Sequence, residues 1–263
     1  MVRVKRKRLD ILLCERGLAP TRERAQALVL AGEVWSGDRR LDKAGSLFDT
    51  GLPLTVRTRM PRFASRGGEK LDHALKSFGI EITDRVCLDV GASSGGFTDC
   101  LLKRGAQHVF SVDVGYGQLD SRLRSDPRVS VLERSNARYL TLEALEKLSS
   151  LARSISVISI DISFISLTKV IPNLQTQFAL ARDWIVLFKP QFEVGREQVG
   201  KGGKVREMRF VEESLRNFRS FIEALGFQWI AGPEKSPLDG KKSGNLEYLI
   251  HYGTPRVSNP SVH

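Results

Sequence analysis

The sequence contains few cysteines and no arrangement that would use them together. The three, Cys14, Cys87 and Cys100, lie far apart, with no Cys-x-x-Cys pair and no metal-ligand spacing with the four histidines. This pattern excludes a disulfide framework and predicts that no metal is bound. It is typical of a reducing compartment, so we expect a cytoplasmic location.

Long hydrophobic runs are also missing. A membrane-spanning helix needs roughly 18 apolar residues without interruption, and no window of the sequence offers them. The N-terminal MVRVKRKRLDILLCERG starts with a basic run, but its apolar stretch is too short and too charged for a signal peptide. With 263 residues, 41% hydrophobic and 27% charged, the chain predicts one or two soluble globular domains without stable membrane insertion.

Acidic residues are in deficit. Asp and Glu number 30 against 41 Lys and Arg, which gives a formal net charge of +11. The excess is uneven, because residues 1–62 hold 14 basic and 7 acidic side chains and so contribute +7 of it. Such an excess predicts a polyanionic partner, contacted mainly by the first quarter of the chain.

Residues 1–60 predict a small α+β domain. Two helices are expected, the second beginning after an N-cap at Thr21 and ending near Gly32. Short strands follow in EVWSGDRRL and LPLTVR, with turns at Gly37-Asp38 and Gly45. The buried faces of the helices are expected to consist of Leu9, Leu12, Leu13 and Leu18 in the first and Ala25, Leu28 and Val29 in the second.

The same segment resembles a small RNA-binding module named after a protein of the small ribosomal subunit. The resemblance is carried by RLDILLCERGLAPTRERAQALVLAGEVWSGD. It implies that Arg8, Arg22 and Arg24 contact RNA, largely at phosphates, which gives affinity and salt dependence rather than base identity. The alternative is that these arginines are ordinary solvated charges on a helix surface.

After a linker at 61–68, residues 69–253 predict an α/β domain, followed by a tail at 254–263. The strands are expected in VCLDVG, HVFSVDVG, ISVISIDISF, WIVLFKP and NLEYLIHY. Helices are expected from near Glu69, around 141–151, up to about Ala181 and through 207–225. Continuous apolar strands separated by helices indicate a mostly parallel sheet, in which ligands bind beyond the carboxyl ends of the strands.

The motif LDVGASSGGFTDCLL at residues 88–102 is the strongest candidate for a ligand-binding turn. Asp89 ends a buried strand, and Gly91, Gly95 and Gly96 keep the turn small. The spacing fits neither the dinucleotide fingerprint nor a Walker phosphate loop. Asp113, 22 residues after Gly91, could accept hydrogen bonds from ribose hydroxyls, so we expect S-adenosylmethionine. Tight packing of the turn is the alternative explanation.

Two charged residues end the following strands. Asp161 closes ISVISI and Lys189 closes WIVLF, so both side chains should open onto the same edge of the sheet. A lysine at such a position needs an acid nearby, because burying an unpaired ammonium is costly. The alternative to a catalytic role is a structural ion pair at the sheet rim. Lys70 and Glu247 are weaker candidates, from their positions alone.

Several ordered motifs between about residues 5 and 252 together resemble the TlyA family, whose members are known as haemolysins and as ribosomal RNA 2′-O-methyltransferases. The motifs are SRGGEKL, LDVGASSGGFTD, DISF, KPQFE, GKGGKVRE and SGNLEYL. The resemblance implies a Rossmann-like, FtsJ/RrmJ-type methyltransferase sheet after the RNA-binding domain. It also implies ribose methylation of a cytidine in ribosomal RNA or ribosomal subunits, with a catalytic tetrad of Lys70, Asp161, Lys189 and Glu247.

The resemblance and the residue pattern together suggest a binding role for each part of the domain. The expected cofactor contacts are Asp89, Gly91, Ser93, Gly95, Gly96, Phe97, Asp113 and, for the adenine edge, Asn136. The glycine-rich loop 195–207 is expected to be mobile and to close Lys201, Lys204 and Arg206 over RNA phosphates, or else to be an ordinary surface loop. One departure concerns the linker, where Arg62-Phe63-Ala64 replaces the aromatic R-x-W-V of the family, so the sequence does not indicate whether linker-dependent coupling of cofactor and RNA binding carries over.

In the expected reaction Lys189 takes the proton of the ribose hydroxyl, Asp161 orients Lys189, and Glu247 positions Lys70. Base N-methylation would favour two prolines after Asp161, which are absent, and pyrimidine carbon methylation would need a cysteine at a strand end. A membrane-active haemolysin and an RNA-binding assembly factor with an inactive methyltransferase domain remain alternatives. The sequence indicates neither the target nucleotide, nor the ribosomal subunit, nor the oligomeric state.

Overall fold

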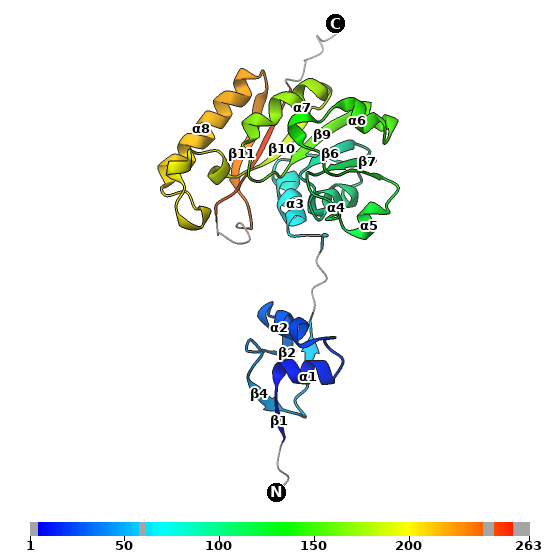
Figure 1. Ribbon diagram of the computed structural model, residues 1–263, viewed down its shortest axis with the longest axis vertical. Helices are drawn as coiled ribbons and strands as arrows, with labels where there is room; N and C mark the ends of the chain where they lie inside the picture. The colour runs from blue at the N-terminus through cyan, green and yellow to red at the C-terminus, as the bar shows by residue number, and fades with distance from the viewer. Residues whose placement is uncertain (1–4, 58–61, 239–244, 255–263) are drawn as a thin grey trace. The chain divides into compact units, whose positions relative to one another are not determined.

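A computed structural model describes residues 5–57, 62–238 and 245–254 of the chain. The chain divides into two compact units, Met1–Met60 and Pro61–His263 (Figure 1). The first has two helices and five short strands; the second has a large sheet between helices.

The N-terminal unit is built as a helix pair on small sheets. Thr21 caps the second helix by accepting a hydrogen bond from the Arg24 backbone N–H at 3.2 Å, and Gly32 after it has a φ of +72°, as the sequence predicts. Two strands, β1 and β4, were not predicted, because each has only three residues and is largely exposed, which leaves no apolar alternation to read. The elements are β1 (Arg6–Arg8), α1 (Leu9–Glu15), α2 (Arg22–Leu30), β2 (Val34–Ser36), β3 (Arg39–Arg40), β4 (Leu47–Asp49) and β5 (Thr55–Val56).

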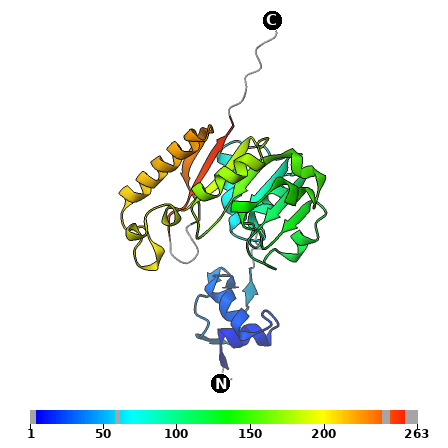
Figure 2. The same ribbon diagram turned by 45° about the horizontal axis from the view of Figure 1, so that its top comes forward.

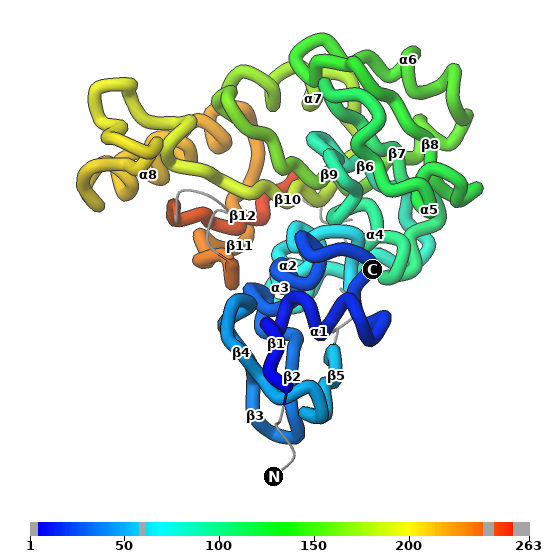
Figure 3. The backbone as a smooth tube through the Cα atoms, turned by 60° about the horizontal axis from the view of Figure 1, so that its bottom comes forward, coloured from blue at the N-terminus to red at the C-terminus, as the bar shows by residue number. Residues whose placement is uncertain are grey.

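The second unit is an α/β domain with a seven-stranded sheet, in the order β11-β12-β10-β9-β6-β7-β8. Strands β6 to β10 are parallel, and β12 runs antiparallel between β10 and β11, as Figures 2 and 3 let the reader follow. The strands are β6 (Val86–Val90), β7 (His108–Val112), β8 (Val129–Leu132), β9 (Ile155–Ile160), β10 (Asp183–Phe188), β11 (Gln228–Lys235) and β12 (Tyr248–Gly253). The mostly parallel sheet predicted from the sequence is therefore confirmed.

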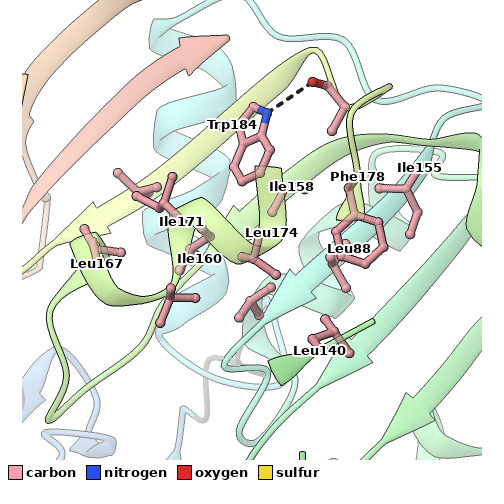
Figure 4. Close-up of a cluster of buried hydrophobic side chains, with 14 of the residues drawn as sticks. Leu88, Leu140, Ile155, Ile158, Ile160, Leu167, Ile171, Leu174, Phe178 and Trp184 are labelled. Atoms are coloured by element: carbon pink, nitrogen blue, oxygen red, sulfur yellow. Dashed lines mark hydrogen bonds between the residues drawn. The ribbon is translucent and has the colours of Figure 1, made fainter. Parts of the chain in front are cut away.

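Helices cover both faces of this sheet, because alternate residues of each buried strand point to opposite sides. One face packs against α3 (Gly67–Ser77), α4 (Gly96–Lys103) and α5 (Ser121–Arg124). The other packs against α6 (Leu142–Glu146), α7 (Ile171–Gln177) and α8 (Met208–Ala224), and Figure 4 shows this core, where Trp184 also donates a hydrogen bond to the Ala181 carbonyl at 3.1 Å. Short 3₁₀ helices are η1 (Ala137–Tyr139), η2 (Ser150–Ser154), η3 (Leu167–Lys169), η4 (Pro190–Phe192), η5 (Arg196–Gln198) and η6 (Lys201–Gly203).

Several predicted boundaries are wrong. The helix expected up to about Ala181 ends at Gln177, and the one expected around 141–151 is divided into α6 and η2. Edge strand β11 was missed because it is exposed at alternate positions, bulged, and contains Gly232-Pro233, which in sequence reads as a turn.

Candidate functional site

The carboxyl ends of the parallel strands meet at one edge of the large sheet. β6 and β9 are neighbours, and the chain leaves them toward opposite faces, which creates the switch point where open α/β sheets bind ligands. Two cavities of about 260 and 390 Å³ open there. We call them the charged cavity and the apolar cavity; because Gly91, Ser93, Asp161 and Ser163 line both, they adjoin.

The charged cavity contains two ion pairs. Lys189 Nζ lies 2.5 Å from Asp161 Oδ1 and donates to Ser163 Oγ at 2.9 Å. Lys70 Nζ donates to Glu247 Oε2. Lys189 is only 8% exposed and Glu247 only 6%, a degree of burial that charged groups tolerate when they are paired. The structure therefore brings together the four residues expected to be catalytic.

Four different elements position these side chains. Asp161 and Lys189 directly follow β9 and β10, whereas Lys70 lies on α3 and Glu247 directly precedes β12. The Lys70–Glu247 contact joins positions 177 residues apart in the sequence. A second contact fastens the helix of Lys70 to the sheet edge, since His73 Nε2 lies 2.5 Å from Glu234 Oε1 on β11.

Sequence reasoning missed three residues of this cleft. Ser163, the hydrogen-bond partner of Lys189, and Phe164 lie within DISF, and Arg66 lies within SRGGEKL, so the motifs contained the signal. Phe164 is 92% exposed and has a φ of +68°. Arg66 is exposed at the charged cavity. It adds a positive charge to two lysine–carboxylate ion pairs, in each of which the two charges balance.

The apolar cavity has polar groups at the ends of β7 and β8. Asp113 Oδ2 accepts a hydrogen bond from the Ser93 backbone N–H and its Oδ1 from that of Gly115, both at 2.7 Å. Asn136 Oδ1 accepts from the Arg138 backbone N–H at 3.0 Å, which leaves its NH₂ group as the available donor. The rest of the wall is largely apolar and includes Val90, Val112, Val114, Ala137, Ile162, Ile165 and Val170.

The glycine turn is shaped mainly by close protein contacts. Gly91 has a φ of +89°, and a Cβ there would lie 2.4 Å from the Asp161 backbone oxygen. A Cβ on Gly96 would meet Ser65 Oγ at 2.2 Å. Gly91, Gly96 and Phe97 line the cleft, but Gly95 does not, because its Cα faces Leu123 instead. Gly95 therefore packs against Leu123, and its expected cofactor contact stays a prediction.

Asp89 also departs from expectation, since it lines neither cavity. Its side chain is fully buried under α4, where Thr98 Oγ1 donates to Oδ2 at 2.7 Å and Ser159 Oγ donates to Oδ1 at 3.4 Å. In the sheet register, Asp89 lies between Ser111 of β7 and Ser159 of β9. Burial raises the pKa of Asp89 to about 7, although the Thr98 hydrogen bond opposes the shift. Asp89 therefore joins three strands and a helix beneath the site instead of contacting a ligand.

The loop 195–207, expected to be mobile, is internally bonded. The Gly200 backbone N–H donates to the Lys204 carbonyl at 2.7 Å, Val199 and Val205 form an isolated bridge, and Asn245 Nδ2 donates to the Gly203 carbonyl at 2.8 Å. The basic side chains remain exposed; they are Lys201, Lys204 and Arg206. The loop is thus a hydrogen-bonded basic segment that follows β10 and η4.

The segment Arg62-Phe63-Ala64 is packed within the second unit. Phe63 is buried against Gly68, where a Cβ would lie 2.3 Å from the ring. Arg62 Nη1 donates to Asp72 at 2.6 Å, and the Ala64 backbone N–H donates to an Asp99 carboxylate oxygen at 2.7 Å. This segment, expected to be a linker, is therefore packed against α3 and α4 just before Ser65 and Arg66 reach the charged cavity.

In the N-terminal unit, two of the three arginines expected to bind RNA share one buried carboxylate. Asp10 is fully buried and accepts hydrogen bonds from both Arg8 and Arg22, while the guanidinium groups remain about half exposed. Hydrogen bonding from Arg8 holds the pKa of Asp10 well below its usual range. Arg24 is exposed in the first turn of α2, the helix that also carries Arg22.

Other chemistries find little support among the described residues. They contain no group of three or more His, Cys, Asp or Glu side chains that could hold a metal, and no helix long and apolar enough to span a membrane. Cys87 and Cys100 are buried away from the cleft, and burial raises the pKa of both thiols to about 12. Neither is suited to act as a nucleophile.

The chain matches two protein-family models and several known proteins. Residues 63–254 match the FtsJ-like methyltransferases and residues 7–52 match the S4 domain. The 16S/23S rRNA (cytidine-2′-O)-methyltransferase TlyA of Mycobacterium tuberculosis is 45% identical over 94% of this chain and 89% of its own length. Hemolysin A of Brachyspira hyodysenteriae is 41% identical over 93% of this chain and 99% of its own.

A solved structure from Streptococcus thermophilus agrees with these matches. It is 38% identical, with a TM-score of 0.70, and the similarity covers 97% of this chain and 90% of that one. The match therefore extends over both units, and not over the methyltransferase sheet alone. The chain belongs to the TlyA family, in which an S4 domain precedes an FtsJ-like methyltransferase domain.

Proposed function

We propose that this protein uses S-adenosylmethionine to methylate the ribose 2′-hydroxyl of a cytidine in ribosomal RNA. The observation that carries the proposal is the charged cavity, in which two lysine–carboxylate pairs lie directly beside a second, more apolar cavity. The named activities of the Mycobacterium tuberculosis relative and of a Campylobacter jejuni TlyA at 33% identity support cytidine as the target. A ribosomal RNA substrate also implies a cytoplasmic location.

The apolar cavity fits the cofactor. Its wall offers apolar surface for a base, the Asn136 amide for a base edge, and the Asp113 carboxylate for ribose hydroxyls, since each carboxylate oxygen can accept more than the one hydrogen bond it has. Gly91 and Ser93 form the junction with the charged cavity. When bound, S-adenosylmethionine would supply an electrophilic methyl group at that junction.

The residues of the charged cavity would hold the attacking hydroxyl and remove its proton. Lys189 contacts the ribose oxygen, and Asp161 and Ser163 fix its amine in direction. Asp161 and Ser163 accept hydrogen bonds from the Lys189 amine, and only the neutral amine can take the hydroxyl proton, so the ammonium form must first transfer a proton to solvent. Glu247 holds Lys70 beside this position as a second cation that stabilises negative charge on the oxygen.

RNA would be held by both units. The S4 domain supplies Arg8, Arg22 and Arg24, and the loop 195–207 supplies Lys201, Lys204 and Arg206. All six are exposed or about half exposed, as contacts to phosphates require.

The test is to incubate the protein with radiolabelled S-adenosylmethionine and unmodified ribosomal subunits, then hydrolyse the RNA with alkali. A methylated 2′-hydroxyl cannot attack the adjacent phosphate, so we expect the label in dinucleotides that resist cleavage. Label in ordinary mononucleotides would mean base methylation and would overturn the ribose assignment. Absence of transfer, together with leakage of liposomes by the Lys189→Ala variant, would favour the haemolysin alternative.

A further inference from the structure

The structure contains a buried carboxylate in the S4 domain to which the methyl-transfer chemistry assigns no role. Asp10 is fully buried on α1, a helix of seven residues. Removing a carboxylate from water is costly, so its burial needs strong compensation from nearby donors.

The compensation comes from three side chains on two other elements. Arg8, at the end of β1, donates through Nε to Oδ1 at 3.0 Å and through Nη2 to Oδ2 at 2.9 Å. Arg22 and Gln26, one turn apart on α2, each donate to Oδ2 at 3.1 Å. Since the Ile11 backbone N–H also donates to Oδ1 at 3.0 Å, the two oxygens accept five hydrogen bonds.

This arrangement holds Arg8 and Arg22 in place and leaves some of their N–H donors free of Asp10. A guanidinium has five N–H donors; Asp10 takes two from Arg8 and one from Arg22. In the described part of the chain no other carboxylate pairs with either group, and their side chains are 44% and 55% exposed. Each arginine therefore presents its remaining donors outward from a fixed position.

We propose that Asp10 is a positioning residue for RNA binding: it holds Arg8 and Arg22 in the geometry in which they contact adjacent phosphates. The inference rests on the proposed RNA substrate and adds how its recognition surface is organised. A flexible arginine loses side-chain entropy on binding, and an arginine that is already held loses less. A negative residue thereby strengthens the binding of a polyanion.

The positioning role predicts that removing the negative charge of Asp10 weakens RNA binding, whereas charge alone predicts tighter binding. Asp10→Asn raises the net charge by one, so attraction by charge alone would tighten RNA binding, whereas loss of positioning weakens it. We expect the dissociation constant for a fluorescent ribosomal RNA transcript to rise about tenfold, measured over a series of salt concentrations. The matched control is Asp42→Asn, which adds the same charge at an exposed position and should leave binding unchanged or slightly tighter.

A second comparison separates positioning from damage to the fold. If Asp10 acts through the arginines, adding Asp10→Asn to the Arg8→Ala/Arg22→Ala background should change affinity less than twofold, because nothing remains to be positioned. That background also leaves Asp10 buried without its charged partners, so the asparagine should not destabilise it further.

The outcomes are distinct. Two results would overturn the positioning role alone. One is that the Asp10→Asn variant binds RNA at least as tightly as wild type. The other is that Asp10→Asn causes a further tenfold loss of affinity in the Arg8→Ala/Arg22→Ala background. Failure of the wild-type protein to bind the transcript at low salt would instead contradict the proposed RNA substrate.

Discussion

At the scale of single residues, the site depends on how each charge is neutralised. Lys189 is buried and pairs with the partly exposed Asp161, yet the lysine must be neutral to serve as a base. Two roles for Lys189 are therefore separable by experiment: acceptance of a proton and stabilisation of charge.

Substitution of Lys189 distinguishes these roles. A positioned base contributes roughly 10²–10⁴-fold, so we expect Lys189→Ala to reduce turnover by about that factor with cofactor affinity retained. Lys189→Arg should be equally impaired, because a guanidinium keeps its proton. Single-turnover rates with ribosomal subunits give the comparison. An arginine variant within tenfold of wild type would assign Lys189 an electrostatic role instead.

Asp89 predicts a pH dependence of stability. Its pKa is raised to about 7 in the folded protein, against about 4 for an exposed aspartate, so the folded state retains a proton that the unfolded state releases between these values. The resulting stabilisation is complete below about pH 4 and is lost as pH rises through 7. Asparagine has no such proton.

We therefore expect the unfolding free energy of wild type minus that of Asp89→Asn to fall between pH 5 and pH 7 and to level off above pH 7. Denaturant unfolding at several pH values measures this difference, and groups that titrate in both proteins cancel. Parallel stability curves for the two proteins would show that Asp89 is ionised throughout.

At the scale of elements, the two loops that follow β6 and β9 are in direct contact. Gly91 lies so close to the Asp161 backbone that no side chain fits between them, and the same contact places Asp161 beside Lys189. The position of the Asp161–Lys189 pair thus depends on a glycine of the neighbouring loop.

Gly91→Ala should be damaging for two reasons. Its φ of +89° disfavours any side chain, and the new Cβ would lie 2.4 Å from the Asp161 oxygen. We expect a loss of about 2 kcal/mol or more in unfolding free energy and a fall in activity of about 100-fold as Asp161 is displaced. The control is Gly79→Ala, where φ is +64° but nothing lies within 4 Å of the Cβ. Equal activity loss in both variants would rule out the contact as the cause.

At the scale of the whole molecule, much of the charge excess lies in two sets of exposed basic groups. One belongs to the S4 domain and the other to the loop 195–207, which follows β10 and η4. Contacts to phosphate release counterions, so each set should contribute to the salt dependence of RNA binding.

Replacement of Lys201, Lys204 and Arg206 by alanine should lower RNA affinity about tenfold and reduce the slope of log affinity against log salt by about one for each lost contact. The matched control replaces Lys147, Arg153 and Arg182, which are exposed near the amino ends of β9 and β10, the opposite edge of the sheet. If the two triple variants bind alike, net charge alone governs affinity and the loop has no specific contact.

The sequence by itself determined the two helices of the S4 domain and the buried parallel strands of the large sheet, because apolar runs and caps are local properties, but it did not indicate the exposed strands β1, β4 and β11. It thereby also determined that Asp161 and Lys189 follow parallel strands and so share one edge. Only the tertiary structure decided the pairing of Lys70 with Glu247, since that contact spans 177 residues.

The direction in which a side chain points within a buried strand was equally beyond the sequence. The sequence predicts that Asp89, at the end of a strand, contacts the cofactor. In the structure, however, α4 covers the face of the sheet on which Asp89 lies. Arg8 and Arg22 read as surface charges, but the packing of α1 against α2 gives them a common buried partner in Asp10. Sequence patterns encode which residues are polar, whereas the choice between solvent, ligand and another side chain as their partner depends on which elements meet.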